Sequence, residues 1–228
     1  ARPALMAGLP LLMAGTAWAA CSDSRWTDAY SEERCSVQGG TAWVQCLEKS
    51  GEECGMRMES TFAVGAGTHS MTIKAAPGPG VVTTFYLSDN GGLYDKTCTK
   101  PWVELDYEIM GNQAKPGSSK VWTNMFVGTC QEHWQFITLP FDVTADFHTY
   151  AFVVTPMSVS FVVDGVTYRT IDASGYPDIR GVTQARSLTE FISVWGKTAA
   201  DEGEGIPEFR AALGVLDTNS NPFPLVAG

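Results

Sequence analysis

The 228-residue sequence contains little charge, and little of that charge is positive: 18% of residues are charged, with 15 Lys and Arg against 25 Asp and Glu. The formal net charge of −10 leaves no basic face for a phosphate backbone, which excludes nucleic acid as a partner. The chain also has no Asn-x-Ser/Thr glycosylation sequence, which disfavours passage through a glycosylating secretory pathway. There is no Cys-x-x-Cys pair, and His69, His133 and His148 lack ligand spacing, so we expect neither a metal nor a cofactor.

The composition favours an all-β protein. Hydrophobic residues make up 44% and aromatic residues 11% of the chain, enough for a sizeable core, while 23 Gly and 12 Pro are typical of many turns. No internal repeat and no alternation of strands with helices is visible, which disfavours a parallel α/β sheet. The length fits one large domain or two small ones.

The first twenty residues are apolar. Residues 3–20 carry no charge, follow Arg2 and end in Ala17-Trp18-Ala19, which is the pattern of a secretory leader with a cleavage site. The same stretch just reaches the roughly 18 residues of a membrane span, so a membrane anchor at 1–20 is equally consistent. Either one predicts an extracytoplasmic protein.

The six cysteines agree with an oxidising compartment. Four crowd the segment 21–55, which we expect to be a Cys-rich extension, and two lie in the β-rich body at 56–228. Sequence alone does not choose among the pairings. Our hypothesis is two disulfides among the first four cysteines and one between the last two, the candidates being Cys21, Cys35, Cys46, Cys54, Cys98 and Cys130.

Short β-type runs separated by turn signals fill the body of the chain. We expect strands at 69–75, 81–88, 102–110, 121–127, 135–139, 148–155, 159–163, 166–171, 191–195 and 209–216. Asp164-Gly165, between two such runs, is a strong hairpin signal. Many short strands at regular spacing predict a β-sandwich or a β-barrel.

The run WVELDYEIM at 102–110 contains three acidic residues at alternate positions. Because side chains alternate along a strand, Leu105 and Tyr107 should face the core, while Glu104, Asp106 and Glu108 share the opposite face. Neighbouring carboxylates repel and raise one another's pKa, so three of them in a row have little use on an open protein surface. In a cleft the same arrangement supplies two carboxyl groups with different protonation states.

The spacing suits acid–base chemistry on a sugar. Four residues of strand separate the Cα atoms of Glu104 and Glu108 by ~13 Å, and the side chains can lean inward to leave about 6 Å between carboxyls. A double-displacement glycosidase needs ~5–5.5 Å. An acidic edge strand or a cation site remains the alternative on spacing alone.

Glu104-Leu105-Asp106-Tyr107-Glu108 resembles the ExDxE signature of glycoside hydrolase family 16, the lichenases, laminarinases and xyloglucan and fungal cell-wall transglycosylases. The flanking runs are similar to the family at its spacing: GVVTTFYL at 80–87, TNMFVG at 123–128, DFHTY at 146–150, VDG at 163–165 and SVWG at 193–196. The resemblance implies a jelly-roll β-sandwich of the concanavalin A-like type, with a glycan cleft on one sheet.

The resemblance also implies roles for particular residues. Glu104 would be the nucleophile, Glu108 the general acid/base, and Asp106 the group that orients and tunes the pair. Asn124 would bond a sugar hydroxyl, with a turn or ladder role as the alternative, and His148 would be structural. An aromatic floor for sugar rings is expected from Trp102, Trp122, Trp134 and Trp195, each of which could instead belong to the core.

The sequence and the resemblance are consistent with two alternative functions. The first is a retaining glycoside hydrolase or transglycosylase acting on a β-glucan-type polysaccharide or oligosaccharide. The second is a family-16-like fold recruited as a non-catalytic subunit on the luminal or outer side of a membrane complex, as in a thylakoid lumen, docked through residues 1–55. The second is motivated by the apolar leader, the cysteines, the absent glycosylation sequences, and Val153-Val154 where the family usually has an acidic residue and a cleft Trp.

Overall fold

The computed structural model describes residues 24–30, 35–38, 41–45, 55–89, 101–129, 131–184, 187–196, 207–213 and 224–227. These residues are mostly strands, with two short helices and one 3₁₀ turn. The elements are β1 (Trp26–Tyr30), β2 (Cys35–Gln38), β3 (Thr41–Gln45), β4 (Gly55–Val64), β5 (Gly67–Lys74), β6 (Val81–Ser88), β7 (Glu104–Met110), η2 (Gly111–Gln113), β8 (Ser119–Val127), β9 (Gln131–Glu132), β10 (Gln135–Leu139), β11 (His148–Val154), β12 (Ser158–Val163), β13 (Val166–Asp172), α1 (Pro177–Gln184), β14 (Leu188–Gly196), α2 (Pro207–Leu213) and β15 (Pro224–Ala227).

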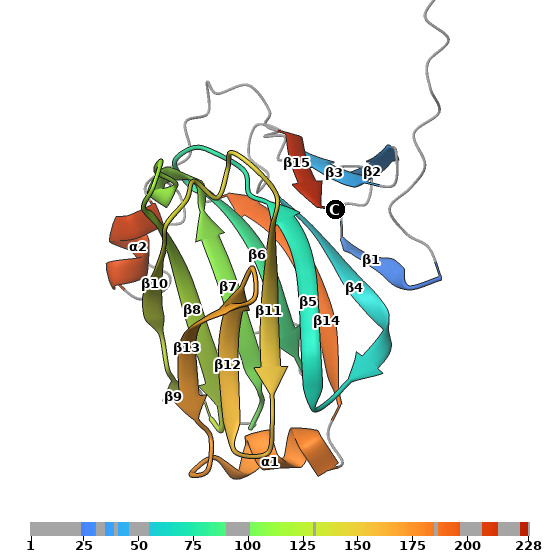
Figure 1. The fold of residues 1–228 in the computed structure, drawn as a ribbon. Helices are drawn as coiled ribbons and strands as arrows, with labels where there is room; N and C mark the ends of the chain where they lie inside the picture. Colours follow the sequence, from blue (N-terminus) through green and yellow to red (C-terminus); the bar gives the residue numbers. More distant parts are fainter. Residues whose placement is uncertain are drawn as a thin grey trace, which may run out of the picture.

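The strands form two antiparallel sheets packed face to face, which confirms the expected all-β sandwich (Figure 1). The first, which we call the β7 sheet, has the order β1-β4-β14-β6-β7-β8-β10, with β9 paired to β8. The second, the β11 sheet, has the order β13-β12-β11-β5-β15-β3-β2. Strands β1, β2 and β3, from the segment expected to be an extension, pair within these two sheets.

The core lies between the sheets and is built by strand alternation. Leu105, Tyr107 and Ile109 of β7 are completely buried in it, together with residues of β11 and β12 such as Phe152 and Phe161. The Tyr107 hydroxyl donates to the backbone carbonyls of Ala151 and Val162, each at 3.1 Å, and so ties β7 to the opposite sheet. This bond satisfies the polar atom that burial of the ring brings into the core.

The expected strand at 209–216 is wrong, because its first residues form the helix α2. Pro207 starts the helix, where a missing N–H is tolerated, and Glu208 complements the positive end of the helix dipole. Phe209 and Leu213 lie on one helical face and pack against Trp122 of β8. The apolar residues at 209–213 therefore follow a helical rather than an alternating period.

Two polar side chains fasten α2 to the end of the β7 sheet. The side-chain amides of Asn112 and Gln113, in η2, both donate to the Ala212 carbonyl, at 2.6 and 2.7 Å. The Gly80 N–H donates to the Leu213 carbonyl at 2.9 Å. These bonds satisfy carbonyl groups that the end of a helix leaves open.

No helix among the described residues is long and apolar enough to span a membrane. The expected leader or anchor at 1–20 lies outside them. Of the six cysteines only Cys35 falls on a described strand, and its side chain and the other five cysteines lie outside the described part. The disulfide hypothesis therefore stays a prediction.

Candidate active site

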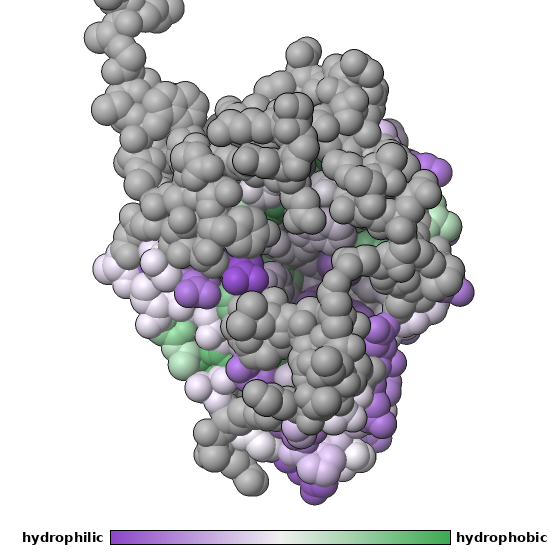
Figure 2. Space-filling view, turned by 180° about the vertical axis from the view of Figure 1, so that it is seen from behind, coloured by the Kyte–Doolittle hydropathy of each residue, from purple (hydrophilic) through white to green (hydrophobic). Residues whose placement is uncertain are grey.

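The three acidic residues of β7 lie on the face of the β7 sheet that points away from the core. Their neighbours in sequence, Leu105 and Tyr107, are fully buried in the core, so the alternation expected from the sequence is present. Glu104 and Glu108 are half-buried, and Asp106 between them is 6% exposed. Figure 2 looks onto this side of the molecule, where hydrophobic and hydrophilic residues lie next to one another.

Strand pairing places polar and aromatic side chains beside each carboxylate. Each acidic residue faces one residue of β6 and one of β8: Ser88 and Phe126 for Glu104, Tyr86 and Asn124 for Asp106, Thr84 and Trp122 for Glu108. Paired residues on one face are direct neighbours. The sheet therefore surrounds the carboxylates with hydroxyl groups on one side and with rings and an amide on the other.

Burial raises the pKa of all three carboxyls. It raises the pKa of Glu104 to about 7, although the Ser88 hydroxyl and the Arg57 guanidinium lower it. Burial, with the charges of Glu104 and Glu132, raises the pKa of Glu108 to about 8. Asp106 lies between the other two, and burial and their charges raise its pKa well above the ordinary value. Ser88 and Arg57 thus favour the ionised form of Glu104, whereas Glu104 and Glu132 favour the protonated form of Glu108.

Arg57, Phe191 and Tyr86 form a stack beside the carboxylates. The Arg57 guanidinium lies 5.4 Å from the Phe191 ring centroid, and the Phe191 and Tyr86 rings stack at 4.7 Å. Arg57 also hydrogen-bonds the Tyr86 side chain, and its charge favours the ionised form of Glu104. Neither Arg57 nor its strand β4 was among the features expected from the sequence, although Met56-Arg57-Met58-Glu59 alternates in hydropathy as a strand should.

The four candidate tryptophans differ in accessibility. Trp102 and Trp122 are 3% and 2% exposed and stack on Phe126 and Trp134 respectively. Trp134, by contrast, is 37% exposed. Trp195 is half-buried and stacks on Phe209 of α2, with ring centroids 6.0 Å apart.

Asn124 is buried and already has partners. Its side-chain oxygen accepts hydrogen bonds from the backbone N–H of Met125 at 2.8 Å and of His133 at 3.1 Å. This contact connects β8 to the turn between β9 and β10. The expected bond from Asn124 to a sugar hydroxyl would therefore use its amide NH₂ group.

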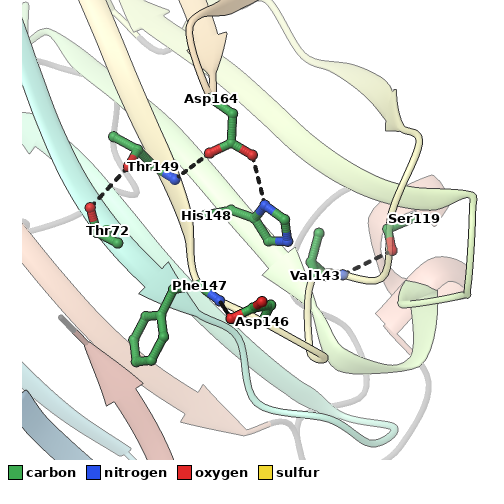
Figure 3. Close-up of polar contacts among 8 residues, drawn as sticks. All are labelled: Thr72, Ser119, Val143, Asp146, Phe147, His148, Thr149 and Asp164. Atoms are coloured by element: carbon green, nitrogen blue, oxygen red, sulfur yellow. Dashed lines mark hydrogen bonds and ion pairs between the residues drawn. The ribbon is translucent and has the colours of Figure 1, made fainter.

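His148 lies on β11, in the other sheet, and its ring contacts Asp164 (Figure 3). Its Nδ1 is 2.7 Å from an Asp164 carboxylate oxygen, and its ring stacks on Phe141 at 3.7 Å. The other Asp164 oxygen accepts the Thr149 N–H at 2.8 Å. Asp164 adopts φ = 49° in the expected Asp-Gly turn, so His148 helps to hold the β12–β13 hairpin.

Val153 and Val154 also lie on β11. Val154 is buried in the core between the sheets, and this departure from the family motif therefore lies away from the three carboxylates. In the part of the chain that the structure describes, no group of three or more His, Cys, Asp or Glu side chains is arranged to hold a metal ion.

Comparison with known proteins agrees with this fold. The sequence model described as "Glycosyl hydrolases family 16" matches residues 22–208, which include all but the first residue of the segment 21–55 that was expected to be a Cys-rich extension. The probable xyloglucan endotransglucosylase/hydrolase protein 12 of Arabidopsis thaliana is 31% identical over 200 residues, which cover 85% of this chain and 64% of that protein. The β-glucanase of Paenibacillus macerans is 29% identical over 151 residues, 64% of this chain and 54% of that protein.

Solved structures share the sandwich. The Bacillus licheniformis β-glucanase superposes with a TM-score of 0.68 at 22% identity, covering 90% of both chains. The apo Crh5 transglycosylase superposes with a TM-score of 0.69 at 21% identity, covering 92% of this chain and 78% of that one. The chain spans 52–64% of the length of the first curated relatives it matches. From the family match over most of its length, the chain belongs to glycosyl hydrolases family 16.

Proposed function

We propose that the protein is a retaining glycoside hydrolase or transglycosylase that acts on a β-glucan-type polysaccharide by double displacement. The observation that carries the proposal is the arrangement on β7, where Glu104 and Glu108 flank Asp106 on one face. Double displacement requires one ionised carboxylate and one protonated carboxyl. The Ser88 hydroxyl and Arg57, which lower the pKa of Glu104, support the first role for Glu104, and the charges of Glu104 and Glu132, which raise the pKa of Glu108, support the second for Glu108.

The first step forms a glycosyl ester. The Glu104 carboxylate attacks the anomeric carbon, the bond from that carbon to the glycosidic oxygen breaks, and the leaving oxygen takes the Glu108 proton. Arg57 and the Ser88 hydroxyl favour the ionised form of Glu104 and so keep it nucleophilic. The charges of Glu104 and Glu132 raise the pKa of Glu108 and so favour its protonated form, while Asp106 between the two has its own pKa raised well above the ordinary value.

The second step releases the sugar. Glu108, now ionised, takes a proton from water or from a sugar hydroxyl, and that oxygen attacks the anomeric carbon as the ester bond to Glu104 breaks. Two inversions at one carbon restore the original configuration. Attack by water gives hydrolysis and attack by a sugar hydroxyl gives transfer, so the same residues serve both outcomes.

The substrate class is supported by the relatives. Those named above are a xyloglucan endotransglucosylase/hydrolase and a β-glucanase, and one structural neighbour is a transglycosylase. These names favour an enzyme over the non-catalytic membrane-complex subunit. An extracytoplasmic location fits the proposal, because a polymeric glycan cannot cross a membrane to reach its enzyme.

Product analysis by mass spectrometry and NMR tests the proposal. Purified protein is incubated with β-1,3-linked, mixed-linked and β-1,4-linked glucan oligosaccharides and with xyloglucan oligosaccharides. We expect shortened or elongated chains whose new ends first appear in the β configuration, and none with Glu104→Gln. Initial products in the α configuration would overturn double displacement. No turnover of any glycan by folded protein would overturn the enzymatic function.

A further inference from the structure

A histidine and a glutamate join the two sheets at a corner of the sandwich. β4 belongs to the β7 sheet and β5 to the β11 sheet, and the turn at Gly65 connects them (Figure 1). His69 lies on the same face of β5 as the core residue Ile73, and Glu190 lies on the same face of β14 as the core residue Leu188. The two side chains therefore meet between the sheets, where His69 Nδ1 is 3.3 Å from Glu190 Oε1.

Both ring nitrogens of His69 lie next to an oxygen that accepts hydrogen bonds. Nε2 is 2.9 Å from the Gly65 carbonyl, which can only accept, and Nδ1 faces the Glu190 carboxyl group. A neutral imidazole has a single N–H, and an ionised carboxylate has no proton to give. Both contacts are hydrogen bonds only while the pair holds one additional proton, on the ring or on the carboxyl group. Without that proton, the lone pair of Nδ1 faces a negative charge.

Water is largely kept away from this pair. The side chains of His69 and Glu190 are 12% and 9% exposed. Their partners on the neighbouring strands are Phe152 of β11 and Leu87 of β6, which are apolar and completely buried. A charge in such surroundings destabilises the fold unless a partner neutralises it. Loss of the shared proton therefore leaves an uncompensated carboxylate inside the sandwich.

In the part of the chain that the structure describes, Glu190 is the one charged group that shifts the pKa of His69. From β4, the neutral Ser60 hydroxyl accepts the Glu190 N–H at 3.0 Å, whereas Glu59 lies on the outer face of that strand. The bond to Glu190 raises the pKa of His69 above its ordinary value of 6.5, burial opposes the rise, and the Gly65 carbonyl adds to it. Such a histidine stabilises the folded protein fully below pH 6.5, and this contribution is lost as pH rises through the raised pKa.

We propose that His69 and Glu190 form a pH-sensitive clamp between the two sheets. With the shared proton present, the pair holds the turn at Gly65 and strand β5 against β14. When the proton leaves at alkaline pH, the bond at Nδ1 is lost and the contact becomes repulsive. Glu190 points into the core, whereas the carboxylates of β7 point to the outer face, so the clamp goes beyond the proposed catalytic function and does not depend on it.

NMR titration of the histidine rings measures the shared proton directly. The chain has three histidines, and the His69 signals are those missing from the double variant His69→Phe/Glu190→Leu. We expect His69 to titrate above pH 6.5, and at a lower pH in Glu190→Gln, because the amide N–H can donate to the neutral ring. Titration of His69 at or below pH 6.5 in the unsubstituted protein would overturn the clamp.

The urea midpoint at pH 6 and at pH 9 measures the effect on the fold. Because the carboxyls of β7 titrate in the same range, each variant is compared with the unsubstituted protein at the same pH. Glu190→Gln should unfold at lower urea at pH 6, where it lacks the ion pair. At pH 9 it should unfold at higher urea, because it keeps both hydrogen bonds to a neutral ring. A midpoint lowered equally at both pH values would overturn the clamp.

Asp164→Asn is the matched control, since it makes the same change beside another histidine. The contact of His148 with Asp164 uses Nδ1, and a neutral ring can donate there, so we expect no gain at pH 9. A gain equal to that of Glu190→Gln would overturn the assignment to the buried pair. The double variant His69→Phe/Glu190→Leu replaces the pair by apolar side chains, and its midpoint relative to the unsubstituted protein should be higher at pH 9 than at pH 6. An equal difference at both pH values would contradict the clamp.

Discussion

Turnover should depend on pH through two limbs, because Glu104 must be ionised and Glu108 protonated in the same molecule. The carboxyl pKa values of about 7 for Glu104 and about 8 for Glu108 set these limbs. Turnover should therefore be highest between the two limbs and should fall toward pH 5 and toward pH 10. The apparent values belong to the coupled pair and not to either residue alone.

The assay is kcat/KM between pH 5 and pH 10 on an aryl β-glycoside whose leaving group departs without protonation, beside a natural oligosaccharide. For the natural substrate we expect both limbs, and Glu108→Gln should lower the rate by about 10²–10⁴-fold. For the aryl substrate the first step no longer needs the acid. The activity of Glu108→Gln on the aryl substrate should therefore remain measurable. Its pH profile should lack the limb near pH 8 and keep the limb set by Glu104.

Glu104→Gln is the matched control, since it changes the neighbouring carboxyl to the same amide and should abolish both reactions. A limb near pH 8 that survives in Glu108→Gln would refute the assignment of that limb to Glu108. A rate that rises steadily from pH 5 to pH 10 would refute the order of protonation itself.

Three further predictions follow from single side chains. Arg57→Met should move the acidic limb of kcat/KM to higher pH, because the guanidinium no longer lowers the pKa of Glu104. Arg57→Lys, which keeps the positive charge, should move the limb less far. An unmoved limb in Arg57→Met would contradict the effect of Arg57 on Glu104. Asp106→Asn should raise the urea midpoint at pH 8, because a carboxyl whose pKa is raised by folding makes the folded protein less stable as pH rises. The gain should vanish below pH ~4, where the Asp106 carboxyl is neutral in the folded and the unfolded protein alike. Tyr107→Phe should reduce the free energy of unfolding by about 1–2 kcal/mol through loss of the bonds to the β11 sheet, measured by urea denaturation, with no change in the pH profile.

The sequence determines the central strand and its two faces. Glu104, Asp106 and Glu108 alternate with Leu105 and Tyr107, and a strand period of two leaves these side chains no choice of side once one face is buried. The signature and the spacing of the runs around it were enough to predict the sandwich. Local patterns succeed here because the strand boundaries and the turn at Asp164-Gly165 depend on local backbone preferences.

The sequence was misleading where partners distant in the chain decide the structure. The apolar residues of α2 resemble a strand when the sequence is considered alone. They form a helix whose apolar face is buried against Trp122 and Val82, residues distant in the sequence. The same holds for Trp134, whose residue type and position could equally have placed it in the core. In the fold it is 37% exposed, on the β9–β10 turn whose His133 carbonyl accepts a hydrogen bond from Arg169 of the opposite sheet.

The electrostatics of the site were likewise decided by the tertiary structure. The sequence places three carboxylates in a row, but it does not determine how much water they lose or which charges approach them. Arg57 comes from β4 and Glu132 from β9, far apart in the chain, and the sheet brings both within range of β7. Burial exists only in the folded sandwich and raises both pKa values, while Arg57 acts on Glu104 and Glu132 on Glu108, so the proposed division of roles between the two carboxyls depends on the fold.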